Sequence, residues 1–315
     1  MLSSLSPIEL LPTELLLLVF HGLTDDARQL CSVRSVCRRW NQLAADDLLW
    51  RVAYARRGWL LPASSANHAR ESDFWRLAYR HAGVRVACLV THGYRGVDRR
   101  FWDRLEWLLP RGSRLSVVDL TNTALARDLH QFDAVFLFSG NKFFDTPDKL
   151  GDALAQYVDS GGGVVLSGFA VCTYCPRGAW ATSISPESST CRSEYCPIVC
   201  CQSVRSGRAC IDSESVACDH PLLRGVGRLE RQMPPVPWRD RLPFGSGEAA
   251  NGCTVLARWD NGHTLVVERP PTAEKGCVVS LNLDPTVSWD SGDAVVLVSN
   301  ALQYVRKPLR FTDGQ

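Results

Sequence analysis

The sequence predicts a protein of the α + α/β class, with a helical domain at residues 7–83 and a doubly wound parallel-sheet domain at residues 84–307. Two observations predict this division. Apolar residues recur at helical spacing over residues 11–50, whereas short apolar runs alternate with helical patterns from Val84 onward. A cysteine-rich stretch at residues 171–219 interrupts the second pattern, and we interpret it as an insert.

Length and composition agree with two domains. The 315 residues and the hydrophobic content of 45% are sufficient for at least one full core. The formal net charge of +2 gives no electrostatic basis for binding nucleic acid. No apolar run approaches the roughly 18 residues of a membrane-spanning helix, and the short run at residues 15–20 has no Lys or Arg before it, unlike a signal peptide. We therefore expect an intracellular protein, cytoplasmic or nuclear, without a membrane partner. Its 13 cysteines are then thiols or metal ligands rather than disulfides.

The first helix is predicted over residues 11–20, where Pro12 occupies the first turn, a position that tolerates its missing N–H. A second helix is capped by Asp25 or Asp26 and carries an apolar stripe made of Leu30, Val33, Val36, Cys37, Trp40 and Leu43. Residues 49–58 and 74–83 each place Trp and Tyr on one helical face and complete the helical domain. Because so short a module buries little surface alone, we expect it to have an exposed apolar face that binds a partner.

The order of these anchor residues resembles the F-box, the helical motif that ties substrate adaptors to a cullin ubiquitin ligase. The resemblance is carried by Leu11-Pro12, Glu14-Leu15, Phe20, Leu23, Leu30, Val33, Val36-Cys37, Trp40, Leu43 and Leu49-Trp50. It implies a Skp-type linker and a cullin as partners. The linker would be contacted by Leu11, Pro12, Leu15 and Phe20, with Trp40 and Trp50 in the core of the module. The alternative is a set of ordinary helices packed on the rest of the protein.

In the second domain, strands are predicted at residues 84–93, 114–120, 133–140 and 162–170. Helical periodicity occupies residues 99–109 and 147–159. A hairpin with the turn Asp260-Asn261-Gly262 follows, and then a last strand at residues 276–283 and a closing helix at residues 293–304. Strands and helices that alternate in this way predict a parallel sheet with both faces covered.

Four phrases of this region resemble class I glutamine amidotransferase-like domains and their trehalose-utilisation relatives. They are LGDALAQYVDSGGGVVLSG, DHPLLRGV, GCVVSLNLDPT and SNALQYV. The resemblance implies a flavodoxin-like sheet order. Active members carry a nucleophilic Cys on a sharp turn after a strand and a His late in the domain. Here the corresponding strand ends in Leu166-Ser167-Gly168-Phe169-Ala170, and no His follows His263. We therefore expect no covalent Cys-His mechanism.

A ligand crevice is expected at the carboxyl ends of the parallel strands. The residues predicted to border it are His92, Ser139, Asn141, Ser167 and Asn282. His92 is a candidate general base or metal ligand, although a His at a strand end is more often a hydrogen-bonded structural residue.

The insert contains a set of cysteines whose spacing approximates a zinc ribbon, namely Cys172, Cys175, Cys191 and Cys196. Only the first two form a well-spaced pair, so we expect ordinary thiols and no cofactor, with a structural zinc as the alternative. A loop of this length near the crevice is expected to serve recognition.

Together these features predict an F-box adaptor whose second domain, a catalytically degenerate one, binds a protein target for ubiquitination. The chain itself would not be an enzyme. One alternative is a hydrolase or amidotransferase relative that uses His92 or a cysteine, with the F-box serving its turnover. The other is a sensor that binds a small molecule in the crevice.

Overall fold

The computed structural model describes residues 16, 19–20, 40, 43–44, 46–56, 83–91, 99–120, 128–139, 147–171, 176–181, 183–184, 191–199, 219–227, 229, 248–260, 262–283 and 293–307. The chain divides into two compact units. The first comprises Met1–Leu60, Ser65–Ala82 and Leu309–Gln315, and the second comprises Leu61–Ser64 and Gly83–Pro308. None of the helices in the described part of the chain has the length and apolarity that a membrane crossing requires.

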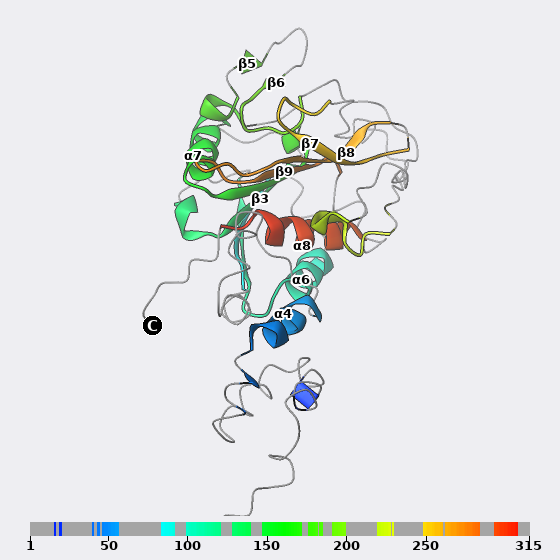
Figure 1. Cartoon of the computed structure of the whole chain (residues 1–315). Coiled ribbons are helices and arrows are strands. Elements are labelled where there is room, and N and C mark those ends of the chain that lie inside the picture. The colour runs from blue at the N-terminus through cyan, green and yellow to red at the C-terminus, as the bar shows by residue number, and fades with distance from the viewer. Residues whose placement is uncertain are drawn as a thin grey trace, which may run out of the picture. The chain divides into compact units, whose positions relative to one another are not determined.

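The first unit is helical where it is described, and its longest described helix is α4 (Asp47–Arg56) (Figure 1). Trp40 and Trp50 are buried, as the sequence predicts for the core of this module. The ring of Trp40 meets the ring of Phe20 edge to face at 5.4 Å between centroids. The indole Nε1 of Trp50 donates to the carbonyl oxygen of Ala44 at 2.9 Å, which ties α4 to the preceding turn.

The second unit is built on a seven-stranded sheet of order β2-β1-β3-β4-β9-β8-β7 (Figure 1). Its strands are β1 (Arg85–Val90), β2 (Arg114–Asp119), β3 (Ala134–Ser139), β4 (Gly163–Gly168), β7 (Thr254–Arg258), β8 (Thr264–Arg269) and β9 (Val278–Leu281). β1 pairs in parallel with β2 and β3, β3 with β4, and β4 with β9. β8 runs antiparallel to β9 and to β7. The five parallel strands have the flavodoxin-like order, which confirms the predicted fold class.

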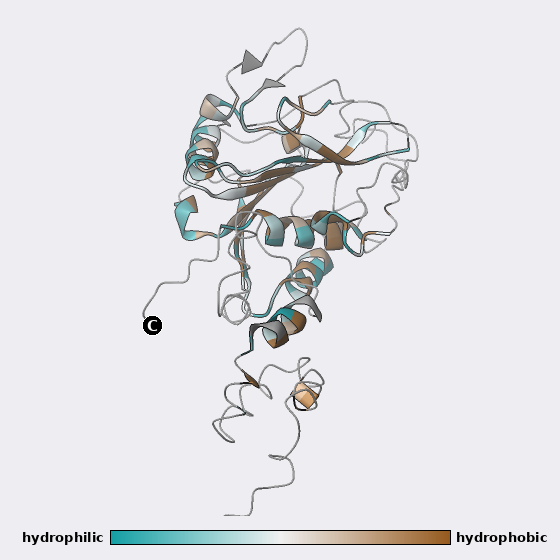
Figure 2. Ribbon diagram, in the orientation of Figure 1, coloured by the Kyte–Doolittle hydropathy of each residue, from teal (hydrophilic) through white to brown (hydrophobic). Residues whose placement is uncertain are grey.

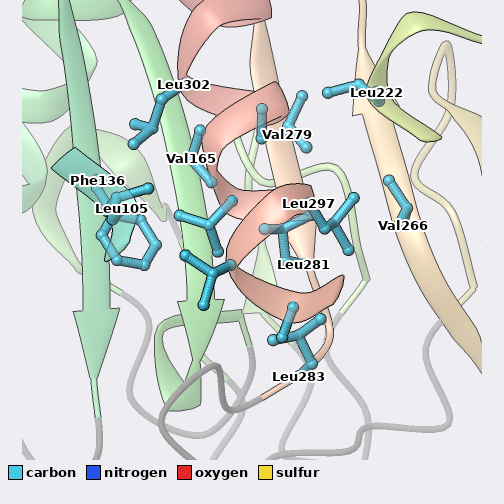
Figure 3. Close-up of a cluster of buried hydrophobic side chains, with 14 of the residues drawn as sticks. Leu105, Phe136, Val165, Leu222, Val266, Val279, Leu281, Leu283, Leu297 and Leu302 are labelled. Carbon is cyan, nitrogen blue, oxygen red and sulfur yellow. The ribbon is translucent and has the colours of Figure 1, made fainter. Parts of the chain in front are cut away.

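Helices cover both faces of this sheet. α7 (Pro147–Asp159) packs on one face, while α6 (Arg99–Leu108) and α8 (Asp293–Val305) share the core of the other. Every residue of β3 and β4 is buried, as expected for central parallel strands. Figure 2 shows apolar residues along the central strands, and Figure 3 shows Leu297 and Leu302 of α8 against Val165, Val279 and Leu281 of the sheet. The predicted helices and strands of this unit are confirmed to within a few residues at their ends.

The described part of the insert begins directly after β4 and packs along α7. It contains the 3₁₀ turns η5 (Phe169–Val171) and η6 (Gly178–Trp180), and a pair of short strands, β5 (Ser183–Ile184) and β6 (Cys191–Arg192). The backbone N–H of Ala179 donates to Asp152 of α7 at 2.6 Å. The hydroxyl of Tyr195 donates to Asp159, the last residue of α7, at 2.8 Å. Since α7 leads into the amino end of β4, Tyr195 lies toward the edge of the sheet opposite the predicted crevice, whereas η5 follows directly on the carboxyl end of β4. The position of the whole insert near the crevice stays a prediction.

Candidate functional site

The helical module presents one exposed and one buried apolar side chain on the same described turn. Phe20 is fully buried against Trp40, whereas Val19 is 46% exposed. Leu16 and Phe20, four residues apart, therefore lie on the buried face, and Val19 lies off it. Leu11, Pro12 and Leu15 lie outside the described residues, so the linker contacts of these three residues and of Phe20 stay a prediction.

The carboxyl ends of the parallel strands are closed by buried hydrogen bonds. At the switch point between β1 and β3, Thr91 and Ser139 share a hydrogen bond of 3.1 Å between their hydroxyl oxygens. The hydroxyl of Ser167 donates to the carbonyl oxygen of Leu283 at 2.8 Å. All three side chains are buried, so they join neighbouring strand ends.

Asn282 plays a similar part on the other side of β4. Its side-chain amide nitrogen donates to the carbonyl oxygen of Thr264 at 2.7 Å, and its backbone carbonyl oxygen accepts from the indole of Trp259 at 3.2 Å. The structure thus brings the predicted residues Ser139, Ser167 and Asn282 to one edge of the sheet. His92 and Asn141 lie outside the described residues, and ligand binding by this set stays a prediction.

Strand β4 ends on a glycine in the left-handed conformation, with φ of +65° at Gly168. A Cβ atom built at this position would lie 2.5 Å from the carbonyl oxygen of Ser139. Real Cβ atoms essentially never approach another atom so closely. Gly168, in the segment Leu166-Ser167-Gly168-Phe169-Ala170 that the sequence analysis compared with a nucleophile turn, therefore has no room for a side chain.

Three described cysteines have thiols that resist ionisation. Burial raises the pKa of Cys88 and, to a smaller extent, the pKa of Cys253. Burial and the neighbouring carboxylate of Glu268 raise the pKa of Cys277. A nucleophilic cysteine needs the opposite shift, because the thiolate is the reactive form.

Of the four cysteines in the predicted zinc set, one has a side chain that the structure describes. Cys196 is buried, and its Sγ lies 4.0 Å from the carbonyl oxygen of Val171. Cys172, Cys175 and the side chain of Cys191 lie outside the described residues. Within the described ranges, no three His, Cys, Asp or Glu side chains are grouped so as to hold a metal ion. The absence of a metal in the insert stays a prediction.

The sequence analysis did not predict one buried polar cluster. Glu268 of β8 accepts a hydrogen bond of 2.8 Å from the hydroxyl of Tyr304, and its other oxygen lies 3.3 Å from Nε2 of His220. Nδ1 of His220 accepts from the backbone N–H of Leu222, which leaves Nε2 to carry the proton toward Glu268. The cluster fastens η7 (Pro221–Leu223), the turn of the DHPLLRGV phrase, to α8.

Comparison with known proteins finds a family match within the first unit. Residues 8–56 match the F-box-like family. Over 132 residues, or 42% of this chain, the sequence is 31% identical to F-box only protein 3 of Mus musculus. Over 127 residues, or 40% of this chain, it is 30% identical to F-box only protein 3 of Homo sapiens. Each match covers 26% of the relative, so the chain spans about a quarter of the length of these curated relatives.

Solved structures with a similar chain trace include ThuA-like proteins. The ThuA-like protein from Bacteroides uniformis is 13% identical, with a TM-score of 0.45, covering 71% of this chain and 92% of that chain. The one from Parabacteroides merdae is 12% identical, with a TM-score of 0.43, covering 70% of this chain and 88% of that chain.

Proposed function

We propose that this chain is a substrate adaptor of an SCF-type cullin ubiquitin ligase. The observation that carries the proposal is the F-box-like domain at residues 8–56, joined to a second, separately packed α/β unit. In this role the F-box-like domain binds a Skp-type linker and the α/β domain binds the target. Catalysis then belongs to the recruited ligase, and the adaptor acts by raising the local concentration of the target near it.

The α/β domain is, in this proposal, a degenerate amidotransferase-like domain that serves as a binding surface. Three features of its described residues support this role. Gly168 has no room for a side chain at the end of β4. The thiols of Cys88, Cys253 and Cys277 have raised pKa values. The polar groups of Ser167 and Asn282 form buried hydrogen bonds that hold the strand ends.

Substitutions in the first helix test the linker contact. The double variant Leu11→Ala, Pro12→Ala and the single variant Leu15→Asp should abolish co-purification of a Skp-type subunit. Val117→Ser is the matched control, because Val117 is a 36%-exposed apolar side chain on β2 of the other unit. It should leave recovery of the subunit unchanged.

The α/β domain should keep its melting temperature in all of these variants, since its core lies in the second unit. Equal recovery of the linker from the parent chain and from both helix variants would disprove the adaptor role.

A further inference from the structure

A cavity of about 650 Å³ lies within the α/β unit at the carboxyl end of β8. Three segments line it: residues 193–199 of the insert, the turn at residues 250–252, and residues 269–276 after β8. Ligand pockets in proteins commonly have volumes of roughly 300–1,000 Å³. The cavity is therefore large enough for a small ligand or the end of a peptide chain.

Strand alternation directs Arg269 toward this cavity. Glu268 contacts Tyr304 of α8, while Val267 belongs to the core on the α7 face. Since successive side chains of a strand point to opposite faces, Arg269 lies on the side of Val267 and of the insert. Arg269 is accordingly among the residues that line the cavity.

The guanidinium of Arg269 lacks a counter-ion within the described ranges. Its Nε atom is buried and has no hydrogen-bond partner there. Leaving a buried N–H donor unpaired is unfavourable by about 1–3 kcal/mol. An anion in the cavity would remove this penalty.

Lys275, the other cation of the cavity, is already neutralised. Its Nζ lies 3.3 Å from Glu194 Oε2 and 3.6 Å from Asp159 Oδ1, and it stands 4.7 Å from the ring centroid of Tyr195. Arg269 is thus the lining cation that makes no ion pair within the described ranges. A single guanidinium matches a planar monoanion with two oxygens, because a carboxylate accepts two parallel hydrogen bonds from it.

The rest of the wall is mainly apolar. Ile198 is 2% exposed and Val199 is 38% exposed, and both line the cavity together with Ala250 and Pro270. A ligand that reaches Arg269 with a carboxylate therefore places its neighbouring atoms against aliphatic side chains.

We propose that this cavity binds a carboxylate flanked by an aliphatic group, with Arg269 holding the carboxylate and Ile198, Val199 and Pro270 contacting the aliphatic part. Two sources carry this chemistry: the free C-terminus of a protein, and a small aliphatic carboxylic acid. In the first case the proposal rests on the adaptor function, since the cavity then binds the C-terminus of the target protein.

Calorimetric titration of the full-length chain tests the site with three probes: N-acetyl-leucine, N-acetyl-leucinamide, and an N-acetylated tripeptide ending in leucine with a free carboxylate. Both acids should bind saturably, and the amide should bind at least roughly tenfold more weakly because it cannot pair with Arg269. Tighter binding of the tripeptide than of N-acetyl-leucine assigns the site to a chain terminus. Weaker binding of the tripeptide assigns it to a small acid.

Two variants and a control locate the contact. Arg269→Gln and Val199→Glu should each weaken binding of the acids by at least roughly tenfold. Arg258→Gln should leave it unchanged, because the Arg258 guanidinium is on β7 and donates to the carbonyl oxygen of Gly262 at 3.1 Å. Melting temperatures of the variants verify that each is folded.

Equal binding of acid and amide, undiminished binding by folded Arg269→Gln, or no saturable binding of either acid would overturn the proposal. Recovery of the Skp-type linker with Arg269→Gln is measured alongside and should equal that of the parent. Failure of acid binding with linker recovery intact refutes the cavity alone, whereas absence of linker from the parent chain refutes the adaptor function alone.

Discussion

Replacing Gly168 by Ala should destabilise the α/β domain far more than the same change at Gly112. Both glycines have positive φ, +65° and +89°, so both substitutions carry the penalty of the left-handed region, about 1 kcal/mol for Ala. The surroundings differ. A Cβ at Gly112 meets no atom within 4 Å, while a Cβ at Gly168 meets Ser139 O at 2.5 Å and Phe138 Cε2 at 2.9 Å.

The clash adds the cost of overpacking a buried site, about 1–3 kcal/mol, because backbone of β3 must move. We therefore expect a loss of unfolding free energy of about 1 kcal/mol for Gly112→Ala and about 3 kcal/mol for Gly168→Ala. Urea denaturation followed by circular dichroism measures both. If Gly168→Ala were no more destabilising than Gly112→Ala, the end of β4 would have room for a side chain, and the argument against a nucleophile there would fail.

Three further predictions concern catalysis, pH and metal. The chain should release no ammonia from glutamine, and ammonia release that disappears in Cys88→Ala or Cys172→Ala would contradict the missing nucleophile. Burial raises the pKa of Tyr157, so its stabilising effect is present below its unfolded pKa of about 10 and is lost as pH rises above that value, at up to about 1.4 kcal/mol per pH unit. Tyr157→Phe should flatten the alkaline fall in a series of melting curves, and an unaltered slope would refute this reasoning. Elemental analysis should find no stoichiometric zinc, and one zinc per chain that is lost in Cys175→Ser would establish the zinc site instead.

The regular elements of the α/β domain were predictable because each carries its own signal. The strands at residues 134–139 and 163–168 are runs of Val, Leu and Phe bounded by small or polar residues. The turn sequence Asp260-Asn261-Gly262 predicts the hairpin of β7 and β8. Tertiary packing agrees with these local preferences, so the boundaries shift by only a few residues.

The sites depend on contacts between distant segments, which no local pattern reports. Glu268 meets His220 from 48 positions away, and Arg269 shares a cavity with Val199 of the insert. One signal of the second site was nonetheless present in the sequence. Strand β8 is TLVVER, so a buried strand ends in two charged residues. For Ser167 and Asn282 the sequence indicated the correct sheet edge, but it could not indicate that their side chains bond to neighbouring backbone.

The central claim is that the F-box-like domain binds a Skp-type linker, and direct reconstitution tests it. The full-length chain is mixed with the purified Skp-type linker of the same organism, and the molar mass of the product is measured by light scattering after size-exclusion chromatography. The adaptor function predicts a one-to-one complex for the parent chain and separate components for the Leu11→Ala, Pro12→Ala variant. Separate components for the parent, or an undiminished complex for the variant, would contradict it.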